Sequence, residues 1–80
     1  MTPKENKNAL KWRCRRGMQE MDILLLRYLD TEYDQAPVQQ QVAFAVLLKQ
    51  QDDILWDWLS GRSIPSEPDL QSVVSACLAN

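Results

Sequence analysis

Along this chain, apolar side chains recur every three or four residues, which is the period of an amphipathic α-helix. Over residues 18–32 the apolar positions follow this spacing and project at 100° per residue onto one stripe. From Leu70 to Leu78, apolar residues fall at i, i+3, i+4, i+7 and i+8. Both segments are therefore predicted to be helices with one face in a core.

A short helix is also expected before Gly17. Asn6 or Asn8 would cap its start, and the helix would carry Leu10, Trp12 and Cys14. Gly17 interrupts the helical pattern and marks the turn into the next helix. The first residues, 1–7, are expected to be disordered.

A third helix is predicted over residues 38–51, after a loop at 33–37. Pro37 suits the first turn of a helix, because its missing N–H is not needed there. Val42 and Val46 repeat on one face, and the surrounding apolar residues predict that this helix is the central one. Its solvated face would be formed by Gln39, Gln40 and Gln41.

The last two helices are indicated by their ends. Asp52 or Asp53 would cap a short fourth helix, and Gly61 would end it in a left-handed conformation. Ser66 and Asp69 have the spacing of a capping box at the start of the fifth. With only two glycines and few β-branched residues, the chain is predicted to be all-α: a compact bundle of about five short helices in one domain, residues 1–80.

Composition excludes several classes of function. The chain has no histidine, the commonest general base and metal ligand. Its two cysteines, Cys14 and Cys77, cannot form a structural zinc site alone. No glycine-rich phosphate loop is present, and the neighbours Asp52 and Asp53 are more simply explained as helix caps than as an acid–base pair. We therefore predict no enzymatic activity and no metal site.

Charge is unevenly distributed. Residues 1–17 hold six of the nine basic residues and one of the eleven acidic residues. Such asymmetry favours contact with an anionic partner, although a solvated basic tail would look the same. Residues 11–16 interleave basic residues with Trp12, as in some nucleic-acid-binding segments, but the acidic remainder would repel phosphates. No targeting sequence or membrane-spanning run is evident, so a cytoplasmic protein with reduced thiols is expected.

The run Arg15-Arg16-Gly17-x-x-Glu20 has no evident role in a core. Its glycine weakens a helix, so the run is a candidate recognition surface. Projected back from the second helix, four residues fall opposite the apolar stripe and would face outward: Arg16, Glu20, Ile23 and Arg27. Two of the three tryptophans are expected in the core, and Trp56 and Trp58 should differ in exposure.

The motif and its surroundings resemble the SdhE-type FAD assembly factors, which are related to the mitochondrial succinate dehydrogenase assembly factor. The similarity spans about residues 10–78, and its segments are Trp12-x-Cys14-Arg15-Arg16-Gly17-Met18-x-Glu20-x-Asp22, Glu32-Tyr33-Asp34, Leu47-Leu48-x-x-x-Asp52, Trp58-Leu59 and Pro65. The resemblance implies five helices. It also implies that the chain promotes covalent attachment of FAD to the flavoprotein subunit of succinate dehydrogenase, and in some bacteria of fumarate reductase.

The resemblance further implies which residues act. The family's Arg-Gly-x-x-Glu motif corresponds to Arg16, Gly17 and Glu20. The full set predicted to bind the partner is Arg15, Arg16, Gly17, Glu20, Ile23, Arg27, Asp52 and Trp58. FAD is expected to be carried by the partner flavoprotein, with no cofactor bound stably by this monomeric chain. The alternatives are an antitoxin-like regulatory protein and a small nucleic-acid-binding module.

Overall fold

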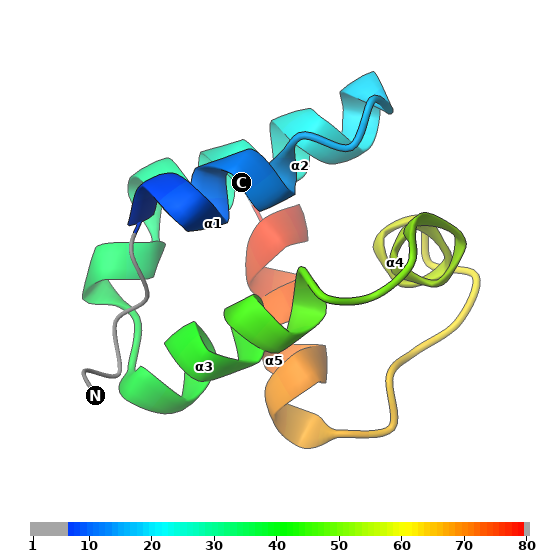
Figure 1. The fold of residues 1–80 in the computed structure, drawn as a ribbon. Coiled ribbons are helices and arrows are strands. Elements are labelled where there is room, and N and C mark those ends of the chain that lie inside the picture. The colour runs from blue at the N-terminus through cyan, green and yellow to red at the C-terminus, as the bar shows by residue number, and fades with distance from the viewer. Residues whose placement is uncertain (1–6, 80) are drawn as a thin grey trace.

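The computed structural model describes residues 7–79, which form helices and connecting loops without strands (Figure 1). The elements are α1 (Lys7–Cys14), α2 (Gln19–Thr31), the 3-10 helix η1 (Tyr33–Gln35), α3 (Val38–Leu47), α4 (Asp52–Leu59) and α5 (Pro68–Leu78). The predicted all-α fold of about five short helices is confirmed. The prediction of disorder at the start of the chain lies outside the described residues, except at Lys7. This residue begins α1, and its Nζ lies 2.9 Å from the Asp34 carboxylate.

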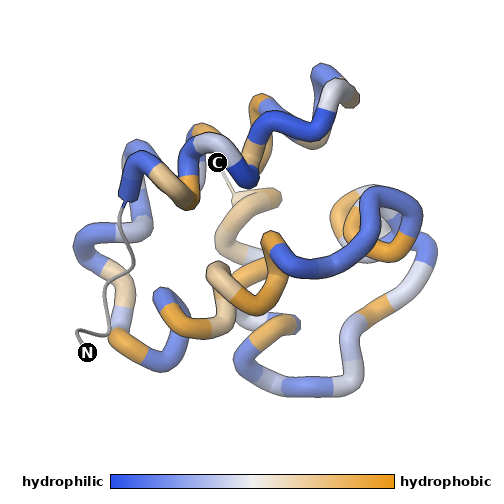
Figure 2. Tube along the Cα trace, in the orientation of Figure 1, coloured by the Kyte–Doolittle hydropathy of each residue, from blue (hydrophilic) through white to orange (hydrophobic). Residues whose placement is uncertain are grey.

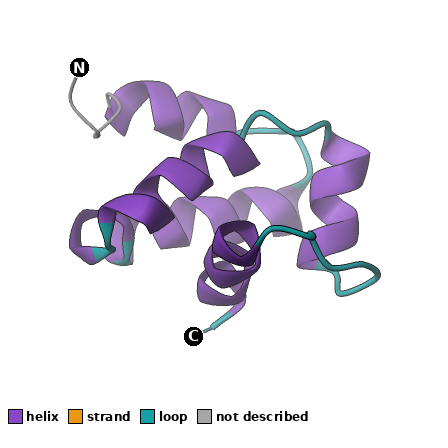
Figure 3. Ribbon diagram, turned by 90° about the horizontal axis from the view of Figure 1, so that it is seen from below, coloured by secondary structure: helices purple, strands orange, loops and turns teal. Residues whose placement is uncertain are grey.

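Helix α5 contacts three of the other four α-helices. It packs against α2, α3 and α4, whereas α1 lies against α2 (Figures 1 and 3). The predicted third helix is therefore not the sole centre of the fold, since α5 packs against three other helices. Helix α5 buries Val73, Val74 and Cys77 of its apolar stripe, whereas Leu70 is half-buried and Leu78 is exposed.

The core draws apolar side chains from every α-helix, and polar positions alternate with them along the trace (Figure 2). Aromatic rings join α2 and η1 to α3, because the Phe44 ring centroid lies 4.6 Å from that of Tyr28 and 5.9 Å from that of Tyr33. The largest fully buried side chains are Tyr28, Tyr33, Phe44, Leu10, Met21, Leu25, Leu47, Leu55, Val73, Cys14 and Cys77.

Helix α3 buries a different face from the one predicted. Gln41, assigned to the solvated face, is buried, and its Nε2 donates to the Tyr33 carbonyl at 2.6 Å. Because this bond satisfies the amide, glutamine can occupy the first position of a buried i, i+3, i+4 stripe with Phe44 and Ala45. Val42 and Val46 consequently remain exposed on the other side of the helix.

Glycines mark the turns, as expected, but the starts of α4 and α5 lack the predicted caps, and the cap predicted at Asn6 lies outside the described residues. Gly61 follows α4 with a φ of 87°, which confirms its left-handed terminating role. The N-cap residues of α4 and α5 are Gln51 and Glu67, and neither makes a side-chain capping bond. The predicted caps at Asp52 or Asp53, and the capping box beginning at Ser66, are therefore wrong.

Candidate functional site

The predicted recognition motif lies where the chain turns from α1 into α2. Gly17 has a φ of 84°, in the left-handed region that side-chain-bearing residues rarely adopt. The backbone N–H groups of Arg16 and Gly17 donate to the two carboxylate oxygens of Asp22, at 2.8 Å and 3.3 Å. Asp22 stands in the first turn of α2, where negative charge is favoured. This carboxylate therefore fixes the path of the turn.

The Arg16 side chain points into the protein and is only 10% exposed. Its Nη1 donates to the Gln50 carbonyl at 2.8 Å and to Asp52 Oδ1 at 2.9 Å. Its Nη2 donates to the Leu48 carbonyl, and its Nε to the Arg13 carbonyl at 3.0 Å. One guanidinium thus ties the turn before α2 to the connection between α3 and α4.

This geometry corrects the predicted outward patch. Arg16 does not share a face with Glu20 and Ile23, because α2 begins only at Gln19 and Gly17 redirects the chain before it. Arg27 is also engaged, since its Nη2 donates to the Cys77 carbonyl at the end of α5, 3.2 Å away. Of the four residues projected outward, only Glu20 and Ile23 are exposed.

What remains exposed around the turn is called here the motif surface: Trp12, Arg15, Gly17, Glu20 and Ile23. Trp12 is 74% exposed, and the Arg15 guanidinium lies 5.9 Å from its ring centroid, within reach of a cation–π interaction. A Cβ added at Gly17 would meet no atom within 4 Å, so this position opens outward. A basic and an aromatic side chain therefore lie together where α1 ends, and the exposed Gly17 follows them in the turn.

Trp12 was not among the residues predicted to bind a partner. The exposure of Trp12 could have been predicted from the spacing, because Leu10 and Cys14 are four residues apart and therefore share one face of the helix, which is buried. A residue midway between them projects to the opposite side of the helix. Trp56 and Trp58, in contrast, are both half-buried and pack against the core without belonging to it. The expectation that two of the three indoles are core residues is therefore met only in part, and the predicted difference in exposure between Trp56 and Trp58 is not seen.

Asp52 and Trp58, the two other residues predicted to bind a partner, lie in different parts of the structure. Asp52 lies against the motif through Arg16, although its own carboxylate is 57% exposed. Trp58 lines a groove of about 410 Å³ formed by residues of α3, α4 and α5 and the loop before α5. The groove also contains the carboxylates of Glu67 and Asp69 but no Lys or Arg.

The described residues offer little chemistry of their own. Burial raises the pKa of the Cys14 and Cys77 thiols to about 12, which disfavours reactive thiolates. Within residues 7–79 there is no group of three or more potential ligands among His, Cys, Asp and Glu that could hold a metal ion. None of the helices described is long and apolar enough to cross a membrane.

Comparison with known proteins accounts for almost the whole chain. Residues 8–79 match the model of a family described as flavinator of succinate dehydrogenase. A FAD assembly factor SdhE from Colwellia psychrerythraea is 39% identical over 75 residues, covering 94% of this chain and 82% of the relative. A protein of the same name from Pectobacterium atrosepticum is 34% identical, covering 89% of this chain and 81% of the relative. Another from Coxiella burnetii is 35% identical, covering 81% of this chain and 79% of the relative. No solved structure matches the chain.

Proposed function

Since this chain belongs to the family of flavinators of succinate dehydrogenase, we propose that it binds the flavoprotein subunit of that enzyme and promotes covalent attachment of FAD. The observation that carries the proposal is the motif surface, where an exposed Gly17 lies on a turn held by Arg16 and an exposed Glu20 follows in the first turn of α2. A surface held in this way needs little ordering when it binds, which favours affinity. The fumarate reductase flavoprotein is a second substrate of the same class.

The chain acts by binding rather than by catalysis. The flavoprotein supplies both the FAD and the side chain that becomes attached to it, and this chain has no histidine to act as a general base. An assembly factor that selects the conformer in which these two groups are aligned accelerates their reaction through proximity and orientation.

Residues of the motif then have separate roles. Glu20 accepts hydrogen bonds from donors on the flavoprotein, and Gly17 allows its backbone to approach closely. Trp12 and Arg15 add an aromatic and a cationic contact just before the turn. Arg16 is a positioning residue, because its guanidinium is directed at the carbonyls of Leu48 and Gln50.

FAD stays on the partner in this proposal. The groove beside Trp58 is lined by two carboxylates and no cation, so it is a poor site for a pyrophosphate. The chain works as a cytoplasmic monomer and binds no nucleic acid. The comparisons do not favour the antitoxin-like alternative.

Coexpression with the flavoprotein subunit tests the proposal. We expect a 1:1 complex on co-purification, and covalent flavin that is visible as fluorescence of the denatured flavoprotein in a gel. Cells that lack this chain should contain the same flavoprotein with little covalent flavin. An equal flavin signal with and without the chain would refute the function.

A further inference from the structure

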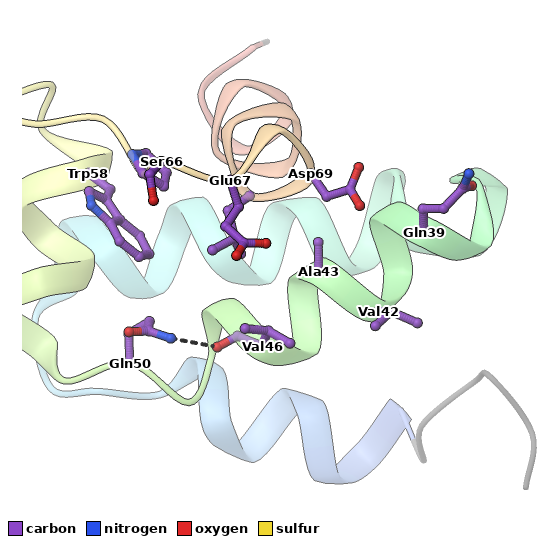
Figure 4. Close-up of a pocket in the computed structure, with 11 residues that line it drawn as sticks. Gln39, Val42, Ala43, Val46, Gln50, Trp58, Ser66, Glu67 and Asp69 are labelled. Carbon is purple, nitrogen blue, oxygen red and sulfur yellow. Dashed lines mark hydrogen bonds between the residues drawn. The ribbon is translucent and has the colours of Figure 1, made fainter.

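The groove beside Trp58 is a feature that the motif surface does not explain. Val42 and Val46 of α3 form one side, and the loop and first turn of α5 form the other, with the Trp58 indole at one end (Figure 4). Val42 is 48% exposed and Val46 is 39% exposed. Leu70 contributes a further apolar side chain from α5.

The apolar wall has the geometry of a helix-binding surface. Val38, Val42 and Val46 are all exposed and four residues apart, so they lie along one side of α3. Val42 and Val46 line the groove, and Val38 continues the row beyond it. At a rise of 1.5 Å per residue the row is about 12 Å long, which matches about two turns of a second helix. The opposite face of α3 is fully used by the core, so this row is free for a partner.

The charged side chains at the rim of the groove are all negative. Glu67 and Asp69 stand along the α5 side of the groove in Figure 4, and no basic residue contributes to the lining. Neither carboxylate forms an ion pair within the part of the chain described here. The remaining polar lining is neutral, supplied by Gln39, Gln50 and Ser66.

We propose that this groove is a docking site for an amphipathic helix of a partner protein, one whose apolar row is flanked by Lys or Arg. The apolar row would pack on Val42, Val46 and Trp58, and the flanking cations would lie against Glu67 and Asp69. A second copy of this chain fits less well. Its basic helix α1 exposes one large apolar residue, Trp12, and therefore lacks an apolar row.

A photo-crosslinking amino acid at position 46 tests the site in the full chain. Expressed in cells and irradiated, this variant should yield an adduct whose cross-linked peptide belongs to another protein and places Lys or Arg beside apolar residues at helical spacing. The same crosslinker at position 23, another exposed apolar residue, reports on the motif surface. If no adduct with the flavoprotein forms at position 23, the proposed function is contradicted, but the proposal for the groove is not affected.

Two sets of variants then measure separately how the charged rim and the apolar row contribute to binding. Reversing the rim with Glu67→Lys and Asp69→Lys should lower adduct yield about tenfold or more. The cross-linked segment, made as a synthetic peptide, should bind the wild-type chain and lose about tenfold in affinity for the Val42→Glu, Val46→Glu variant, whose fold is checked by circular dichroism. The proposal is overturned by absence of an adduct at position 46, by an adduct with a second copy or an acidic segment, or by a yield indifferent to rim charge.

Discussion

The guanidinium of Arg16 lies 2.9 Å from the carboxylate of Asp52, so the turn before α2 is bound to the first residue of α4. The same guanidinium also reaches the carbonyls of Leu48 and Gln50, which end α3 and begin the connection to α4. The arginine of the motif therefore belongs to the framework, whereas Gly17 and Glu20 belong to the surface that it supports.

Replacing Arg16 with lysine should destabilise the fold by about 1–3 kcal/mol, although the charge is kept. A single ammonium cannot span the carbonyls of Leu48 and Gln50 and the Asp52 carboxylate as the planar guanidinium does. Urea denaturation followed by circular dichroism measures the difference. Arg15→Lys is the matched control, since Arg15 is exposed and should lose almost nothing.

The partners of Arg16 should contribute unequally. Asp52→Asn should cost at most about 1 kcal/mol, because its carboxylate is 57% exposed and water screens the pair. If Arg16→Lys is no more destabilising than Asp52→Asn, the backbone contacts at Leu48 and Gln50 carry no weight and the clamp described above is wrong.

Two helices could be predicted well because one local pattern decides each. The apolar residues of α2 and α5 recur mainly along one face of each helix, and the predicted segments agree with Gln19–Thr31 and Pro68–Leu78 to within a few residues. The buried face of α3 was predicted wrongly because both sides of this helix carry apolar residues. The face that is buried includes Gln41, whose amide is satisfied by the Tyr33 carbonyl eight residues earlier, and periodicity does not reveal such a bond.

The site was harder to predict for the same reason. The acceptors of the Arg16 guanidinium at Leu48, Gln50 and Asp52 lie 32 to 36 residues further along the chain, and only the folded arrangement brings them near. A helical wheel extended through Gly17 treats that turn as helix and sends Arg16 outward. The predicted outward orientation is confirmed for Glu20 and Ile23, which lie within α2 and are exposed.

Gly17→Ala should reduce covalent flavin attachment more than its effect on stability explains. Gly61 gives a matched control, because its φ of 87° is nearly the same as the 84° of Gly17 and an added Cβ meets no atom at either position. Each substitution should therefore cost about 1–2 kcal/mol through backbone strain alone. We expect loss of in-gel flavin fluorescence only for Gly17→Ala. Equal flavinylation by the two variants would remove Gly17 from the partner contact.

Glu20→Gln should weaken binding to the flavoprotein while leaving stability within about 0.5 kcal/mol of the wild type. Glu20 is exposed in the first turn of α2, so the change removes a charge from the surface and no packing from the core. Asp30→Asn is the control, because it removes one charge from the exposed far end of the same helix. Affinity measured by titration calorimetry should fall for the first variant alone, and a parallel fall in both would point to net charge instead of a specific contact.

The free energy of unfolding should decrease as pH rises from about 9 towards 12. Burial raises the pKa of the Cys14 and Cys77 thiols from 9.0 to about 12 in the folded protein. In the unfolded chain these thiols lose their protons near 9, so between the two values the unfolded state binds fewer protons than the native state. Stability is therefore fully present below about pH 9 and is lost progressively above it.

A Cys14→Ala, Cys77→Ala variant isolates this effect. Its absolute stability will be lower because two buried side chains are shortened, so the quantity to compare is the slope of unfolding free energy against pH. Tyr28 sets a residual slope in both proteins, since burial also raises the pKa of its hydroxyl. Urea titrations under reducing conditions at about pH 8 and about pH 11 should give a flatter dependence for the variant. Equal slopes would mean that the thiols titrate alike in both states, and that Cys14 and Cys77 are accessible to water in the native fold.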